Sequence, residues 1–289
     1  MPPENASADG PGFVFTHIPK TGGSNFAGAL KSVVGLAACS SIFCAHDAMS
    51  CWFTEHAIAH RRAHACNLAA AEGFLRDNLA AAATLWPSRP IRSVLLLRRP
   101  QAHVLSLYAH CQQPKAEGFI FHGYARIGLA EWLLGAAERN ATEVARFCSY
   151  SPVNHQVARL SGSGAPEGVE ATNSASALGR AVRALDGAWF VGVSDWFDAS
   201  VCALARRLDR ELPGTGGGAV ACASSSAERL THGTRTSQLV IDGQVRAAID
   251  RITRDDAVVH AHAVVRLEQD VREQGGELRR LRSGRARRR

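Results

Sequence analysis

The sequence predicts an α/β protein, with a three-layer αβα arrangement around a central, mostly parallel sheet. Short continuous apolar runs at residues 13–18, 92–98 and 188–193 read as buried strands, because strands inside a parallel sheet are apolar on both faces. Each run is followed by a segment with helical patterning. Strands that alternate with helices predict βαβ units, in which helices cover both faces of the sheet.

The charge of the chain is concentrated at one end. The 289 residues carry a net charge of +7, and the stretch Arg279–Arg289 contains seven Arg and no acid, so the rest of the chain is neutral. A solvated tail is the simpler interpretation; weak binding to acidic glycan, membrane surface or nucleic acid is the alternative, and no specific nucleic-acid partner is expected. We expect a disordered leader at 1–11, one domain at 12–273 and a basic disordered tail at 274–289.

The first unit is a strand at 13–18, a tight turn and a helix that runs to about residue 34, with Ser24 or Asn25 as the N-cap. The turn contains Lys20, Thr21 and a Gly pair. Backbone N–H groups at such a turn, together with the positive end of the helix dipole, form an anion site. The first unit therefore predicts a site for a phosphate or sulfate group.

Residues 36–66 are rich in Cys and His, and residues 67–84 are Ala-rich and predicted to be helical. A zinc site is one interpretation of the first part, and its ligands would be Cys39, Cys44, His46 and Cys51. The spacing lacks the paired C-x-x-C pattern of structural zinc sites, so buried or disulfide-bonded cysteines are favoured.

The second unit is the strand at 92–98, which ends at Arg98-Arg99-Pro100 and precedes a helix. Ligands of open α/β sheets bind outside the carboxyl ends of the strands. Lys20 and Arg98 both follow such ends, so we expect them to converge on one crevice.

The remaining chain contributes helices at 129–139, 152–161 and 176–185 and the strand at 188–193. Ser194 or Asp195 is the predicted cap of a helix to about residue 212, and a last helix runs from about Asp242 to about Glu273. Loops are expected at 113–128 and 162–175. No run approaches the roughly 18 apolar residues of a membrane-spanning helix, so no transmembrane segment is expected.

The loop differs from that of a nucleoside triphosphatase. A Walker A loop reads G-x-x-x-x-G-K-[ST], whereas here the Lys precedes the Gly pair, and no apolar strand ends in a metal-binding Asp. Kinases and ATPases need metal to neutralise their phosphates. A sulfuryl group carries less charge, so a Lys and backbone donors would suffice.

Four segments resemble the carbohydrate sulfotransferases, above all the heparan sulfate 2-O- and 6-O-sulfotransferase group. The loop reads H-I-P-K-T-G-G-S from His17, and the segment from Leu97 reads L-R-R-P, followed by His103 and L-S-L-Y from Leu105. Asn154-His155-Gln156 with Leu160-Ser161-Gly162, and F-V-G-V-S-D-W-F from Phe190, are similar to two further family segments. Arg99 and His103 stand where the family has Asp and Arg.

This resemblance implies a P-loop-NTPase-like fold, the donor 3′-phosphoadenosine 5′-phosphosulfate, a carbohydrate hydroxyl as acceptor, no metal, and a place in the Golgi lumen or membrane. Lys20 would stabilise the leaving phosphate, and Arg98 and Ser106 would bind the 3′-phosphate. The 5′-phosphate would be held by the backbone N–H groups of Thr21, Gly22, Gly23, Ser24 and Asn25.

The resemblance also implies a histidine general base. His64 lies about where the 6-O group has its base, and His46 is the second candidate. An acidic residue, or no base, remains open. Two other functions compete with catalysis of sulfuryl transfer: a degenerate member that binds nucleotide or glycan without turnover, and a nucleotide kinase.

Overall fold

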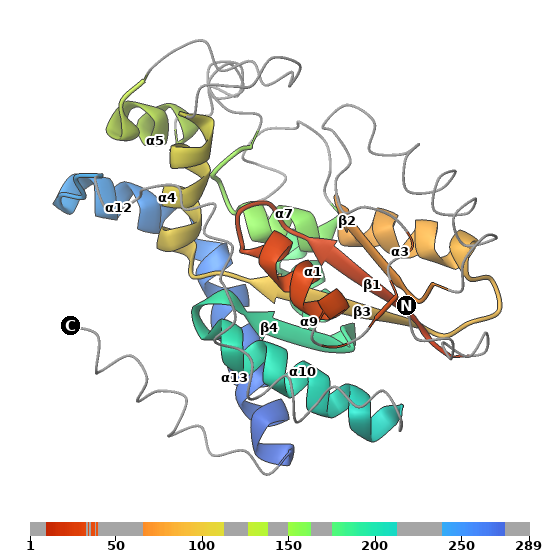
Figure 1. Ribbon diagram of the computed structural model, residues 1–289. Coiled ribbons are helices and arrows are strands. Elements are labelled where there is room, and N and C mark those ends of the chain that lie inside the picture. Colours follow the sequence, from red (N-terminus) through yellow and green to blue (C-terminus); the bar gives the residue numbers. More distant parts are fainter. Residues whose placement is uncertain are drawn as a thin grey trace.

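A computed structural model describes residues 10–32, 34, 36, 37, 39, 66–112, 127–137, 150–162, 175–212 and 239–274. Its centre is a parallel sheet in the order β2-β1-β3-β4 (Figure 1). The strands are β1 (Gly12–His17), β2 (Leu68–Glu72), β3 (Ile91–Leu97) and β4 (Phe190–Val193). The predicted α/β class and parallel sheet are confirmed.

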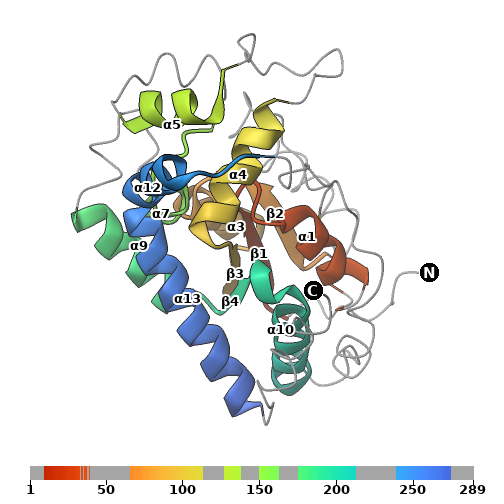
Figure 2. The same ribbon diagram turned by 90° about the vertical axis from the view of Figure 1, so that its left-hand side faces the viewer.

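Helices pack on both faces of the sheet, which gives three layers (Figure 2). One face carries α1 (Gly23–Ser32) and α10 (Phe197–Glu211); Phe26 of α1 lies between Phe15 of β1 and Phe197 of α10, with ring centroids 5.4 and 5.9 Å apart. The other face carries four helices. They are α3 (Leu75–Leu85), α7 (His155–Ser161), α9 (Ala175–Gly187) and α13 (Arg254–Glu273).

Three further helices form a second hydrophobic core beside the end of β3. These are α4 (Pro100–Cys111), α5 (Leu129–Ala137) and α12 (Gly243–Ile252), which lie together at the upper left of Figure 1. Trp132, Leu107 and Ile249 are fully buried among them. Within the described ranges, no helix is both long and apolar enough to cross a membrane.

The predicted helix at 67–84 is wrong in its first part. Residues Leu68–Glu72 form β2, which pairs in parallel with β1, and α3 begins only at Leu75. Alanine favours helices, but the small side chains of this run are buried against the sheet, and the pairing overrides local propensity. Gly73, with φ +153°, turns the chain between strand and helix.

The predicted last helix is two helices, because Thr253 ends α12 and α13 starts at Arg254. Asn154, with φ +40°, accepts hydrogen bonds on Oδ1 from the N–H groups of Asp255 and Asp256, 3.1 and 3.2 Å away. Asp256 in turn accepts from the N–H groups of Gln156 and Val157. The starts of α7 and α13 therefore cap each other, which fixes α7 beside the end of β3.

Two predicted N-caps are also corrected. Helix α1 begins at Gly23, so Ser24 and Asn25 lie within its first turn. Residues Ser194–Trp196 form a 3₁₀ turn, and α10 starts at Phe197 without a side-chain cap. Asp242 does cap α12, because its carboxylate accepts a hydrogen bond from Val245 N at 2.8 Å. Residues 1–9 and 275–289, and the loops 113–126 and 163–174, lie outside the described residues.

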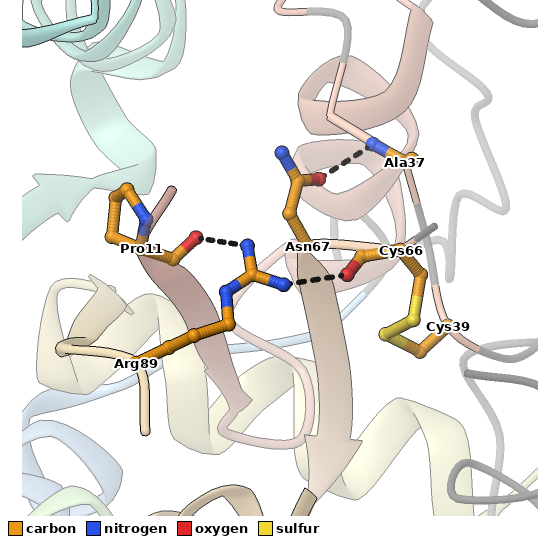
Figure 3. The surroundings of a disulfide bond; sticks show 6 residues. All are labelled: Pro11, Ala37, Cys39, Cys66, Asn67 and Arg89. Atoms are coloured by element: carbon orange, nitrogen blue, oxygen red, sulfur yellow. Dashed lines mark hydrogen bonds between the residues drawn. A yellow bond between two sulfur atoms is a disulfide. The ribbon is translucent and has the colours of Figure 1, made fainter. Parts of the chain in front are cut away.

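A disulfide joins Cys39 to Cys66, which lies beside the start of β2 (Figure 3). The two segments also pair through their backbones, since Cys39 N donates to Leu68 O at 2.8 Å and Asn67 N donates to Ala37 O at 2.9 Å. The Asn67 side chain adds a third bond, because its Oδ1 accepts from Ala37 N at 2.8 Å. Cys39 is therefore no zinc ligand. The other predicted ligands, Cys44, His46 and Cys51, lie outside the described residues.

Replacement of both Cys39 and Cys66 by serine is expected to lower the free energy of unfolding by about 3 kcal/mol, because the sequence separation of 27 leaves a large loop to be closed. Urea denaturation followed by circular dichroism measures this loss. The dependence of the unfolding free energy on urea should be somewhat steeper than that of the wild type, because the unlinked chain exposes more surface when it unfolds. A loss below about 1 kcal/mol would show that the backbone pairing alone closes the loop.

Candidate functional site

The loops that follow β1 and β3 meet at the carboxyl edge of the sheet. β2 lies on one side of β1, and β3 lies on the other. The strand order therefore reverses between β1 and β3, and such a switch point is where open α/β sheets bind their ligands. Arg98, directly after β3, donates a hydrogen bond from Nη1 to the carbonyl oxygen of Lys20 at 2.9 Å. The structure thus brings together the two cations that the sequence placed at strand ends.

The loop after β1 has an unusual backbone. Lys20 has φ +64° and Gly22 has φ +92°, so the chain turns sharply before α1. Thr21 is fully buried and donates from Oγ1 to Ile18 O at 2.9 Å, and its N–H donates to the same oxygen at 3.3 Å. A non-glycine residue in this region is strained and marks a candidate functional position.

The first turn of α1 provides the free donors. The helix begins at Gly23, and Phe26 N donates to Gly22 O at 3.1 Å. The N–H groups of Gly23, Ser24 and Asn25 therefore have no partner within the helix. Of the five predicted phosphate-binding groups, these three are the best placed, because the Thr21 N–H is already engaged.

Position 23 must be a glycine, because the His17 ring fills the space that a side chain would need. A Cβ built on Gly23 would lie 1.9 Å from Cδ2 and 2.5 Å from Nε2 of the His17 ring. That ring is buried, and its Nδ1 lies 3.4 Å from Oε1 of Glu72. The ring cannot move away from α1 without displacing the end of β2, so the loop depends on a glycine here.

Two later segments hold Arg98 in place. The side-chain amide of Gln156 accepts from Arg98 N and donates to Arg98 O, both at 2.9 Å, as a neighbouring strand would. Asp195 accepts a hydrogen bond from Arg99 N at 3.1 Å. Burial would raise the pKa of Asp195, but His260 and the Arg99 N–H lower it to about 2. Asp195 is therefore an ionised clamp and not the predicted helix cap.

The residues that depart from the family pattern both have structural partners. The Arg99 guanidinium is 56% exposed and lies 3.8 Å from Asp195 Oδ1. His103 is buried, and its Nε2 lies 2.8 Å from Pro19 O; a carbonyl oxygen only accepts, so Nε2 carries the proton and donates. Burial lowers the pKa of His103 to about 4. It is therefore a neutral support for the loop.

The two cations at the site are held at an energetic cost. Burial lowers the pKa of Lys20, and the nearby Arg98 charge lowers it further, while Glu72 raises it. Burial also lowers the pKa of Arg98, against the opposing effect of Asp195. Two half-buried like charges repel each other, so a bound anion would stabilise both.

An acidic residue that the sequence interpretation missed lies beside Lys20. Glu72 is the last residue of β2 and is paired in register with His17. The Tyr150 hydroxyl donates to its Oε2 at 3.3 Å. Arg159 of α7 also acts on its charge. The signal that could have found it is a short apolar run that ends in Glu-Gly, but the alanines of that run indicated a helix.

The remaining predicted site residues are placed less tightly. Ser106 lies on α4 with a buried side chain, 4% exposed, so its contact with a 3′-phosphate stays a prediction. His46 and His64, the two candidate bases, lie outside the described residues. No group of three or more metal-ligating side chains occurs in the part of the chain that the structure describes.

Comparison with protein-family models gives no match for this chain, and a search of curated proteins gives none either. The site therefore has to be interpreted from its own geometry.

Because His103 is buried in its neutral form, the protein is expected to lose stability in acid. The folded pKa of His103 is about 4, below its ordinary value of 6.5, so its contribution is complete above pH 6.5 and is lost as the pH falls through 4. Between pH 7 and 4 the wild type should lose about 3 kcal/mol more than His103→Gln, which keeps an N–H donor for Pro19 O. Urea titrations at both pH values measure this difference; His262→Gln on α13 controls for the substitution. Equal losses would contradict the assignment.

Proposed function

We propose that this chain is a sulfotransferase that moves a sulfuryl group from 3′-phosphoadenosine 5′-phosphosulfate to a hydroxyl of a carbohydrate. The fold would then be of the P-loop-NTPase-like αβα type. The observation that carries the proposal is the meeting of Lys20, the open first turn of α1 and Arg98 at one edge of the sheet. Two mutually repelling cations beside free N–H groups fit a donor with two separate anionic groups.

Different residues would bind the two phosphates of the donor and stabilise the leaving group. The N–H groups of Gly23, Ser24 and Asn25 would bind the 5′-phosphate at the positive end of α1. Lys20 would stabilise the charge that develops on that phosphate as the bond to sulfur breaks. The Arg98 guanidinium would bind the 3′-phosphate, with Gln156 holding the backbone of Arg98 and Asp195 holding that of Arg99. Donation from Arg98 to Lys20 O links the two halves of the site.

The cysteines support a place in an oxidising compartment, such as the Golgi lumen that the resemblance implies. Among the described residues all four cysteines are disulfide-bonded: Cys39, Cys66, Cys111 and Cys202. Disulfides are rare where cytosolic thiol systems keep cysteines reduced. A carbohydrate acceptor is consistent with such a compartment, and its identity rests on the resemblance alone.

The direct test is transfer of radiolabelled sulfate from the donor to a panel of glycans, with a chelator present to remove divalent metal. The proposal predicts labelled glycan product without metal. A degenerate binding protein, the second candidate, would bind adenosine 3′,5′-bisphosphate and give no product. Arg99 favours that candidate, because it adds a cation where the family has an acid. Magnesium-dependent turnover of ATP would instead support a nucleotide kinase.

A further inference from the structure

We propose that the general base of the transfer is Glu72, at the end of β2. This inference rests on the proposed sulfotransferase function and assigns a role that the sequence interpretation gave to His64 or His46. Its basis is the position of one partly exposed carboxylate at the same edge of the sheet as Lys20.

The fold places Glu72 opposite the phosphate loop. β1 and β2 are neighbouring parallel strands, and His17 and Glu72 are paired at their carboxyl ends. The chain leaves β1 through Lys20, and Glu72 acts electrostatically on that ammonium group. The Tyr150 hydroxyl donates a hydrogen bond to Oε2 of the carboxylate at 3.3 Å, and the neutral His17 ring packs beside Oε1, with Nδ1 3.4 Å away. Its side chain is still 19% exposed, so a hydroxyl can reach it.

The three imidazoles around this edge are unsuited to accept the proton of the acceptor hydroxyl. The His17 ring is packed against Gly23, and burial lowers its pKa to about 4. His103 and His155 are buried, and each donates to a backbone carbonyl, of Pro19 and Ser151 respectively. His155 Nε2 accepts a hydrogen bond from Arg159 at 3.3 Å. Of these four groups, Glu72 is the one whose side chain remains open to an acceptor.

The surroundings of Glu72 suit a proton acceptor at neutral pH. Burial raises the pKa of its carboxyl group; Arg159, the Tyr150 hydrogen bond and Lys20 lower it, and the net pKa is above the ordinary value. A stronger carboxylate base is better matched to an alcohol proton. Arg159 is itself fixed by stacking on Phe74, 4.8 Å from the ring centroid.

A Glu72 oxygen takes the proton of the acceptor hydroxyl while the hydroxyl oxygen forms a bond to sulfur. The bond between sulfur and the 5′-phosphate oxygen breaks, and its electron pair stays on that phosphate, where the Lys20 ammonium stabilises it. The products are the sulfated acceptor and adenosine 3′,5′-bisphosphate, and Glu72 gives its proton to solvent.

The test compares Glu72→Gln with the wild type and with Glu131→Gln, a matched change on the exposed face of α5. Glutamine keeps the shape of the side chain and an oxygen for Tyr150. We expect kcat for labelled sulfate transfer to fall by about 10²- to 10⁴-fold in Glu72→Gln. Binding of adenosine 3′,5′-bisphosphate, measured by calorimetry, should change less than about threefold, since the base does not hold the nucleotide. Glu131→Gln should match the wild type in both measurements.

A second variant changes the pKa of Glu72 and leaves the carboxylate itself in place. The Tyr150 hydrogen bond lowers the pKa of Glu72, so Tyr150→Phe should move the acid limb of the kcat/KM profile to higher pH by about one unit. An unmoved limb, or full activity in Glu72→Gln, would overturn the assignment of Glu72 and leave the sulfotransferase proposal standing. The same holds if His64→Asn or His46→Asn abolishes that limb. Absence of transfer by the wild type would overturn both.

Discussion

Lys20→Ala is expected to lower kcat for sulfuryl transfer by about 10²- to 10³-fold, the usual cost of removing one group that stabilises transition-state charge. Lys20 is the cation of the loop after β1, and its positive φ angle is typical of a functional position. The variant should be at least as stable as the wild type, because a desolvated ammonium group beside Arg98 is removed. Loss of activity would then not be loss of folding.

Two controls make this result specific. Lys31→Ala removes a lysine in the last turn of α1 and should leave transfer unchanged. Lys20→Gly also lacks the ammonium group but fits the backbone angle without strain. If Lys20→Gly is active where Lys20→Ala is not, a changed loop conformation and not the lost charge is the cause. If Lys20→Ala and Lys20→Gly both have the kcat of the wild type, Lys20 has no role in the mechanism.

Gly23→Ala is expected to weaken binding of adenosine 3′,5′-bisphosphate by at least about 100-fold. The substitution would displace the N–H groups that form charge-assisted hydrogen bonds with the 5′-phosphate. The added Cβ would overlap the His17 ring, and that ring is backed by Glu72. Either the loop or the end of β2 must shift. The variant should also lose about 1–3 kcal/mol of stability through overpacking. Calorimetric titration and urea denaturation measure the two effects.

The chain offers a matched control on the same helix. Nothing lies within 4 Å of a Cβ built on Gly28, so Gly28→Ala should bind nucleotide normally and gain about 0.5–1 kcal/mol from better helix propensity. The double variant His17→Ala/Gly23→Ala opens the space that the new methyl needs and should recover part of the binding. Normal binding by Gly23→Ala alone would contradict the close packing of loop and ring.

The elements with strong local signals could be predicted from the sequence. The apolar runs of β1, β3 and β4 have such signals, and so does the turn with Lys20 and Gly22. β2 could not be predicted, because Leu-Ala-Ala-Ala favours a helix in isolation and only pairing with β1 makes it a strand. Since Glu72 belongs to that strand, the missed strand hid the carboxylate from the candidate site.

Other features depend on contacts between residues that are distant in sequence. The amide of Gln156 holds Arg98, and Asn154 and Asp256 cap each other's helices across the fold. No periodicity or spacing encodes such pairs. The resemblance drew attention to residues 154–156 and 190–197, but it did not indicate that they position Arg98 and Arg99.

The central claim is that the loop after β1 and Arg98 together bind a nucleotide with a 3′-phosphate. Calorimetric titration of the wild type with adenosine 3′,5′-bisphosphate tests it most directly, beside adenosine 5′-monophosphate and magnesium ATP. We predict metal-independent binding of the bisphosphate, weaker by about 10- to 100-fold for the monophosphate, which lacks the partner of Arg98. Arg98→Ala should abolish that difference. Equal binding of the two nucleotides by the wild type, or binding of magnesium ATP alone, would contradict the claim.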